Sequence, residues 1–286
     1  MNPMFSRILK ALCTLAAVAL LSACGGASST VEPFHPTRVV GLGDGYNDAT
    51  ATVVVAGSTT GTVVGQVAAY FGQSNVVSQA ASGARIGDLA NQITAVGSFT
   101  EGDLVVITVG AFDVKVGANA ANEAQTLVTQ VQRLKSAGVK HILIMPVLEL
   151  SRTPWGRANN FDPTATPTNS LTNTFNSEVL NAFSTAFGSQ MPNSVVYANV
   201  TNLAPSFLTA TSLTSYSSFT DTGYNGTALG TTPACGSATS FAGCVSGAAT
   251  ASYTTMLFAD GVHLTPLGNQ WVAQFLYNAA RVGSWI

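Results

Sequence analysis

The sequence predicts an α/β protein in which a mostly parallel sheet of about five strands forms the middle layer of a three-layer α/β/α sandwich. Two observations predict this class. Five short apolar runs alternate along the chain with segments that have helical periodicity. The chain of 286 residues, of which 47% are hydrophobic, is also long enough to bury one sizeable core.

The predicted strands are short apolar runs that helical stretches separate from one another. They are Arg38–Leu42, Asn75–Gln79, Leu104–Val109, His141–Met145 and Ser194–Tyr197. In a parallel sheet of this kind the ligand crevice lies beyond the carboxyl ends of the strands. Functional residues are therefore expected just after these runs.

Three helical stretches carry a continuous apolar face. In EAQTLVTQVQRLKSAG, which ends at Gly138, this face consists of Leu127, Val128, Val131 and Leu134. In SLTNTFNSEVLNAF it consists of Leu171, Phe175, Val179, Leu180 and Phe183. The last helix is predicted to begin with Thr265 as its N-cap and Pro266 in its first turn. Its inward residues are Leu267, Trp271, Val272, Phe275 and Leu276.

The N-terminus is expected to direct export. Arg7 and Lys10 form a basic region, and the apolar run ALCTLAAVALLSA that follows is too short for a stable membrane span. The segment LLSAC resembles the bacterial lipobox. Residues 1–23 are therefore predicted to be a lipoprotein signal peptide, with Cys24 as the lipidated first residue of the mature chain. The alternative is an ordinary secretory signal in which Cys24 is incidental.

A lipid on Cys24 would anchor the protein to a membrane of the bacterial cell envelope. Residues 24–37 are then the lipidated cysteine and a Gly/Ser/Pro-rich flexible tether, and residues 38–286 form the domain. No acidic residue follows Cys24 directly, which favours the outer membrane. The domain is expected to face the periplasm or the cell surface.

Two further cysteines remain in the mature chain, Cys235 and Cys244, in the loop ACGSATSFAGC. The loop contains no histidine, so a zinc site is not expected. Outside the cytoplasm the two thiols are predicted to form a disulfide. Both lie in residues 206–256, a Ser/Thr/Gly/Ala-rich insertion without clear periodicity. An insertion of this length is typical of a lid, a binding surface or a partly disordered segment.

The composition excludes an extended basic binding surface. Only 8% of the residues are charged, and the formal net charge is −2. Neither nucleic acid nor an anionic lipid surface is therefore an expected partner. Asp44, Asn47 and Asp48 lie close together, but the spacing of an EF-hand is not present. No metal and no cofactor is expected.

Four segments of the chain resemble the sequence blocks of the SGNH or GDSL hydrolase family. They are GLGDGYND after the first strand, QAASGARIGDL with Gly83, VITVGAFD with Gly110 and Asp113, and FADGVHLTPLGNQ with Asp260 and His263. The order and spacing of the four blocks make the resemblance specific, and it spans residues 38–286. The resemblance implies a flavodoxin-like sheet and the hydrolysis of acyl esters on lipids or carbohydrates.

The same resemblance assigns catalytic roles to the matching residues. In this family a serine attacks the ester carbonyl, a histidine takes its proton, and an aspartate orients the histidine. Asp260 and His263 match the aspartate and the histidine. The chain has two other histidines, but His35 lies in the tether and His141 opens a strand.

Two of the family's defining residues are replaced. Gly45 stands where the family has its serine, and Phe112 stands where it has an asparagine that binds the oxyanion. The backbone N–H groups of Gly45 and Gly83 match the two remaining oxyanion donors. Loss of the nucleophile of a triad costs on the order of 10⁶ in kcat, so efficient ester hydrolysis is not expected.

The expected function is that of an exported, lipid-anchored relative of ester hydrolases that is inactive or severely impaired and binds an acyl or carboxylate ligand. One alternative is an active esterase or lipase with a non-standard nucleophile, or with a water molecule that His263 activates. Another is a structural or adhesive envelope lipoprotein in which residues 206–256 bind the partner.

Overall fold

The computed structural model describes residues 32–50, 61–165, 169–188, 194–198, 233–235, 239–241, 258–283 and 285. The chain divides into two compact units, residues 1–33 and 34–286, and the second contains all the described helices and strands. Cys24, Cys244 and most of the insertion 206–256 lie outside the described residues.

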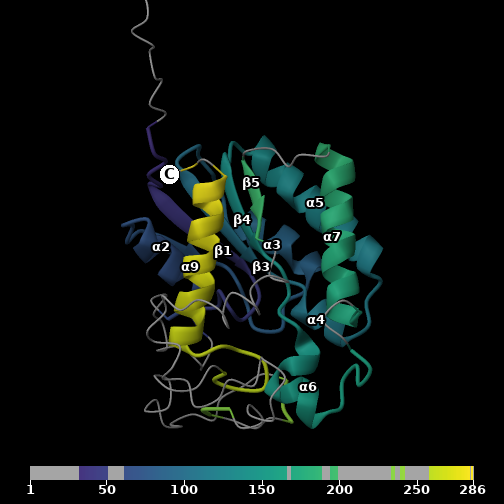
Figure 1. Cartoon of the computed structure of the whole chain (residues 1–286). Helices are drawn as coiled ribbons and strands as arrows, with labels where there is room; N and C mark the ends of the chain where they lie inside the picture. The colour runs from purple at the N-terminus through teal and green to yellow at the C-terminus, as the bar shows by residue number, and fades with distance from the viewer. Residues whose placement is uncertain are drawn as a thin grey trace, which may run out of the picture. The chain divides into compact units, whose positions relative to one another are not determined.

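A five-stranded parallel sheet runs through the second unit (Figure 1). Its strands are β1 (Arg38–Gly43), β2 (Val76–Ser78), β3 (Asp103–Thr108), β4 (His141–Met145) and β5 (Val195–Tyr197). Their spatial order is β2-β1-β3-β4-β5, and each neighbouring pair is parallel. All five predicted strands are confirmed, and the strand order is that of flavodoxin-like sheets.

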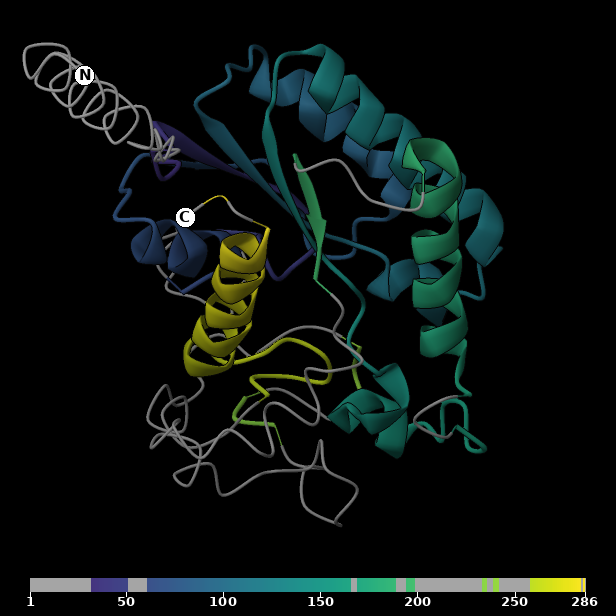
Figure 2. The ribbon, with the colours of Figure 1, turned by 45° about the horizontal axis from the view of Figure 1, so that its top comes forward.

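Helices cover both faces of this sheet (Figure 2). On one face lie α2 (Val63–Tyr70) and α9 (Pro266–Val282). On the other lie α3 (Leu89–Val96), α5 (Ala120–Ser136) and α7 (Leu171–Phe187). Alternate residues of β3 supply the two cores: Val105 packs with the second group of helices, and Val106 packs with the first. The predicted three-layer sandwich is confirmed.

Short helical segments follow several of the strand ends. They are η1 (Ile86–Asp88), α4 (Ala111–Lys115), η2 (Leu150–Arg152) and α6 (Pro154–Ala158). Within the described residues, none of the helices has the length and apolarity that a membrane crossing requires.

The predicted inward faces of α5 and α9 are largely confirmed. The four predicted residues of α5 are buried. In α9, Trp271, Val272 and Leu276 are buried and Phe275 is partly buried, whereas the side chain of Leu267 lies outside the described part. The hydroxyl of Thr265 accepts a hydrogen bond from the N–H of Gly268, so this residue is the predicted N-cap.

The prediction for α7 is wrong at two positions. Leu171 and Leu180 are 54% and 41% exposed, whereas Phe175, Val179 and Phe183 are buried. The buried residues recur every four positions and form one stripe along the helix. Leu180 is turned by about 100° from Val179, which takes it off the stripe. Leu171 is the first residue of the helix, and its side chain is exposed although the neighbouring Ser170 and Thr172 are buried.

The compact unit begins at Phe34, before the domain start expected at Arg38. Phe34 stacks on His141 with 3.5 Å between ring centroids, and its N–H donates to the carbonyl oxygen of Trp285. The indole of Trp285 also packs edge-on against His141. Burial lowers the pKa of His141 to about 4. The end of the predicted tether thus packs with the domain, and His141 serves this packing.

Candidate functional site

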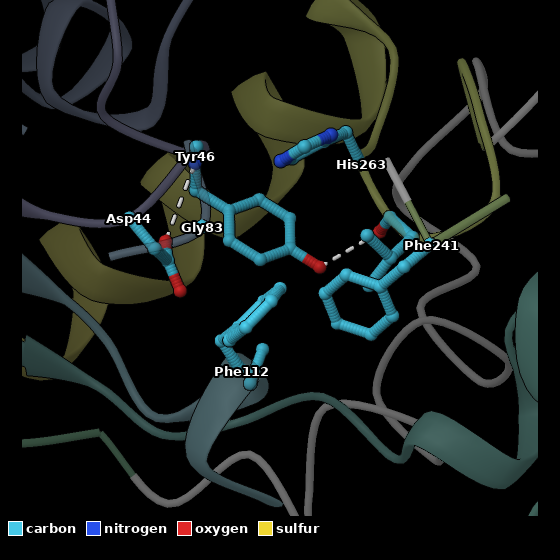
Figure 3. A pocket seen from close by; sticks show the side chains of 9 residues that line it. Asp44, Tyr46, Gly83, Phe112, Phe241 and His263 are labelled. Carbon is cyan, nitrogen blue, oxygen red and sulfur yellow. Dashed lines mark hydrogen bonds between the residues drawn. The ribbon is translucent and has the colours of Figure 1, made fainter. Parts of the chain in front are cut away.

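A small cavity lies where the four sequence blocks meet, beyond the carboxyl ends of the strands (Figure 3). Its volume is about 10 Å³, close to the smallest space that holds one water molecule. Its walls are formed by Asp44, Gly45, Tyr46, Gly83, Ala111, Phe112, Phe241, Val262 and His263. The fold therefore brings together four residues predicted for the site from distant parts of the sequence, namely Gly45, Gly83, Phe112 and His263.

The backbone just before position 45 is held in a fixed conformation. Gly43 has a φ of 108°, and a Cβ atom there would lie 1.8 Å from the carbonyl oxygen of Thr108, so glycine is required. The buried side chain of Gln92 binds both polar backbone atoms of Gly43. Its Oε1 accepts from the N–H at 2.6 Å, and its Nε2 donates to the carbonyl oxygen at 2.9 Å. These bonds fix the strand end from which residue 45 follows.

Asn47 and Asp48 hold the turn after β1. Nδ2 of Asn47 donates to one carbonyl oxygen in β1 and to one in β3, both at 3.0 Å. Asp48 accepts from the N–H of Ser82 at 2.8 Å, which joins the turn to the loop that carries Gly83. Among the described residues, no group of three His, Cys, Asp or Glu side chains could hold a metal ion.

Asp260 and His263 form a buried hydrogen-bonded pair. The Nδ1 atom of His263 lies 2.8 Å from Oδ2 of Asp260, whose Oδ1 accepts from the N–H of His263 at 2.6 Å. This contact assigns the proton to Nδ1 and leaves Nε2 for the cavity. Burial by itself lowers the pKa of His263, but Asp260 and, beyond it, Asp44 and Asp48 outweigh this effect, so the pKa is raised.

The imidazole occupies the place where a side chain at position 45 would begin. A Cβ atom built on Gly45 would lie 1.9 Å from Nε2 of His263 and 2.8 Å from its Cδ2. Figure 3 shows the ring directed toward the turn that carries Asp44 and Tyr46. A serine at position 45 would therefore require His263 to withdraw.

Two backbone donors remain beside the imidazole. Gly45 and Gly83 both line the cavity. In the part of the chain that the structure describes, neither N–H donates a hydrogen bond. Gly83 has a φ of 82°, and a Cβ there would approach the ring of Phe112 at 3.9 Å. The two glycines that the resemblance assigned as donors thus line the same cavity as the ring of Phe112.

An aromatic cluster forms the opposite wall of the cavity. The rings of Phe112 and Phe241 pack edge-to-face at 5.5 Å, and Trp155 packs against Phe241 at 5.0 Å. The Nζ atom of Lys115 lies 4.6 Å from the centroid of Phe112 and 4.7 Å from that of Phe241. The sequence did not predict Phe241 as a site residue, because it lies in the aperiodic insertion and no pattern marks it.

The described fragments of the insertion pair with the loop that carries the site. The N–H of Cys235 donates to the carbonyl oxygen of Ala259 at 2.7 Å, directly before Asp260. The predicted disulfide partner, Cys244, lies outside the described residues. The Cys235–Cys244 disulfide therefore stays a prediction.

Asp44 adds a second carboxyl group to the wall of the cavity. The residue is 6% exposed, and its Oδ1 accepts a hydrogen bond from the N–H of Tyr46 at 3.3 Å. Burial raises the pKa of Asp44 to about 7, even though His263 acts to lower it. The hydroxyl of Tyr46 donates to the carbonyl oxygen of Val262 at 2.8 Å, so its oxygen is tied to the loop of His263.

The fold and the site together define a class of protein. A flavodoxin-like parallel sheet carries a buried aspartate–histidine pair at its strand ends, beside Gly45. The model of the family described as GDSL-like Lipase/Acylhydrolase matches residues 33–276. The chain belongs to this family.

Solved structures with the same fold include proteins from this family. A member of the lipolytic protein G-D-S-L family from Veillonella parvula is 12% identical, with 84% of this chain and 96% of that chain covered and a TM-score of 0.50. The acetyl xylan esterase AlAXEase is 15% identical, with 85% and 98% covered and a TM-score of 0.50. At these identities the likeness shows the fold alone. No curated protein is significantly similar in sequence to this chain.

Proposed function

We propose that this chain is an exported, lipid-anchored member of the GDSL family that does not hydrolyse esters through a serine and binds the carboxylate of a small acid at the family's site. The observation that carries the proposal is the position of the His263 imidazole. Its Nε2 lies 1.9 Å from the place of a Cβ at Gly45, so the space for a nucleophilic side chain is filled.

The groups around the cavity support a carboxylate ligand. The raised pKa of His263 favours the imidazolium, which presents an Nε2–H donor. The N–H groups of Gly45 and Gly83 add two donors without a partner among the described residues. Charge-assisted hydrogen bonds of this kind are stronger than neutral ones. The rings of Phe112 and Phe241 form an apolar wall beside these donors.

Ligand-induced stabilisation of the full chain tests this proposal. Because the cavity is small, formate and acetate are the first ligands to measure. A ligand that binds only the folded state raises Tm with concentration, and we expect a saturable rise for both acids. Acetamide, a neutral molecule of similar shape, is the control and should have a much smaller effect. An equal rise with acetamide, or a rise that matches chloride at the same ionic strength, would contradict the proposal.

A second candidate function is slow ester hydrolysis, which the intact Asp260–His263 hydrogen bond of 2.8 Å favours. Without a serine nucleophile the rate is expected to be low. Hydrolysis of p-nitrophenyl acetate and butyrate by the full chain, compared with His263→Gln, measures it. Turnover that the substitution leaves unchanged does not arise at this site.

The envelope location rests on the lipobox-like segment that ends at Cys24. Metabolic labelling with palmitate is expected to mark the wild type and not Cys24→Ser. Cys13→Ser lies in the predicted signal peptide and serves as the matched control that keeps the label. Labelling that survives Cys24→Ser would contradict the lipid anchor.

A further inference from the structure

We propose that Nε2 of His263 itself acts as the nucleophile in slow ester hydrolysis at this site. Its substrates would be activated acyl donors such as aryl esters and thioesters. This inference rests on the second candidate function above, slow ester hydrolysis at this site. It names the attacking atom and the class of ester that can react.

The geometry places Nε2 where an attacking atom is needed. In a serine esterase of this family, the residue that matches Gly45 carries the nucleophilic oxygen. Here a Cβ at that position would lie 1.9 Å from Nε2, so the nitrogen occupies the start of that side chain. Gly45 and Gly83, whose N–H groups have no hydrogen-bond acceptor in the described part of the chain, line the same cavity. An acyl group attacked by Nε2 would have these donors available for its oxyanion.

The Asp260 contact makes this nitrogen a competent nucleophile. Oδ2 of Asp260 lies 2.8 Å from Nδ1 of His263 and accepts its proton in a hydrogen bond. Nε2 carries a lone pair only in the neutral ring, so the attack takes place above the raised pKa of His263, whereas the imidazolium that binds a carboxylate exists below it. The Asp260 carboxylate increases the basicity of Nε2. The two backbone bonds to Oδ1, from Val262 and His263, hold the carboxylate in place. These hydrogen bonds orient the imidazole so that Nε2 can attack an acyl carbon in the cavity.

The first half of the reaction forms an acyl-imidazole. The Nε2 lone pair bonds to the acyl carbon, and the carbonyl electrons move to its oxygen. When the tetrahedral oxyanion collapses, the bond to the leaving oxygen or sulfur breaks, and its electron pair leaves with the phenolate or thiolate. The enzyme is left as an acyl-imidazolium, with the Nδ1 proton still on the Asp260 hydrogen bond.

Water completes the reaction. It adds to the acyl carbon, the C–N bond breaks, and the electron pair returns to Nε2. The products of this half are a carboxylate and two protons, one of which neutralises the phenolate or thiolate. The ester and one water are thus converted to the acid and the free phenol or thiol, and the imidazole is regenerated.

The loss of an acid catalyst limits the substrates. In a serine esterase the protonated histidine gives its proton to the departing alkoxide. When the histidine is the nucleophile it has no such proton on Nε2, so the leaving group must depart as an anion. Phenolates and thiolates can do so, whereas an alkoxide is a poorer leaving group than imidazole, and the tetrahedral intermediate returns to substrate. Alkyl esters are therefore expected to be unreactive.

Rapid-quench mass spectrometry of the full chain with p-nitrophenyl acetate tests the inference. We expect a burst of p-nitrophenol, a transient adduct of one acetyl group on His263 located by peptide mapping, and a solvent deuterium isotope effect near unity. Ethyl acetate should give neither product nor adduct. In His263→Gln the burst and the adduct should be absent, with folding checked by circular dichroism.

Each other result overturns the inference. Hydrolysis that needs His263 but shows no adduct and a marked isotope effect would mean that the histidine activates water. An acetyl group on another residue would identify a different nucleophile. The adduct is read on the wild-type chain, so the test does not depend on a variant that folds. If the formate and acetate titrations succeed while no adduct forms, the carboxylate proposal stands and this inference fails.

Discussion

A side chain at position 45 and the imidazole of His263 would compete for the same space. An ideal Cβ on Gly45 lies within 3.0 Å of three ring atoms of His263. The ring cannot move freely, because Asp260 holds its Nδ1 and the side chain is only 8% exposed. At this residue the absence of a side chain and the inward position of the histidine are one structural feature.

Gly45→Ala is expected to destabilise the fold by about 1–3 kcal/mol, because the added methyl group overpacks a buried site. Denaturant unfolding measures the change. Gly87→Ala is the matched control, since nothing lies within 4 Å of a Cβ at Gly87. If Gly45→Ala unfolds at the same midpoint as Gly87→Ala, the imidazole moves aside at no cost and the account of position 45 is wrong.

Carboxylate binding is expected to weaken as the pH rises through about 7. Burial raises the pKa of Asp44 to about 7, so this carboxyl group is neutral below that pH and negative above it. The pKa of His263 is also raised, because its carboxylate neighbours outweigh the effect of burial. As the pH rises, His263 therefore loses its positive charge while Asp44 gains a negative one. Asp48, with a lowered pKa, stays negative throughout, and Asp260 keeps its hydrogen bond to the ring. Both titrations therefore make the cavity more negative.

Acetate titrations on either side of pH 7 check this expectation. Asp44→Asn removes one of the two titrations and should flatten the pH dependence. An affinity that rises with pH, or does not change, would contradict the assigned charges.

At the scale of elements, α7 carries both residues that are packed in the core and apolar residues that are exposed. Phe183 is fully buried and belongs to the core that α5 and the sheet share, whereas Leu180 on the same helix is 41% exposed. Phe183→Ala is expected to cost about 3–5 kcal/mol and Leu180→Ala less than about 1 kcal/mol. Chemical denaturation of the two variants measures this difference. Equal losses would mean that the packing of α7 differs from the one described.

The elements could be predicted because local signals and burial agree. The runs of Val, Ile and Leu in β1, β3 and β4 are buried on both faces and leave no competing helical pattern. The error in α7 arose because Leu171 and Leu180 fit an apolar pattern that does not show where the core ends. Apolar residues on a surface are common, so the pattern alone could not exclude them.

The site was predicted only as far as its residues have a sequence pattern. The four blocks led to Gly45, Gly83, Phe112 and His263, which the fold places around one cavity. The contact between position 45 and the imidazole could not be predicted, since it depends on where the last loop places the ring in space. Phe241 could not be predicted either, because its role depends on contacts with distant rings.

At the scale of the whole molecule, the parallel sheet separates the packing around Phe34 from the candidate site. The stack of Phe34 on His141 lies where β1 and β4 begin, so the chain enters the domain at the amino ends of the strands. Of the residues that line the cavity, Gly45, Gly83 and Phe112 follow the carboxyl ends of β1, β2 and β3. A substitution at the amino ends of the strands can therefore leave the candidate site at the carboxyl ends intact. Sites in folds of this kind usually lie at the carboxyl ends.

The proposal that this chain does not hydrolyse esters through a serine can be tested with an alkyl fluorophosphonate, a reagent for activated serines. After the reaction, the full chain is examined by intact-mass analysis and peptide mapping. Because Gly45 has no side chain and the imidazole of His263 fills the space beside it, we expect that no serine, threonine or tyrosine will carry a phosphonyl group. Stoichiometric phosphonylation of one such residue would show that the protein has an activated hydroxyl nucleophile, and the account of this site would be wrong.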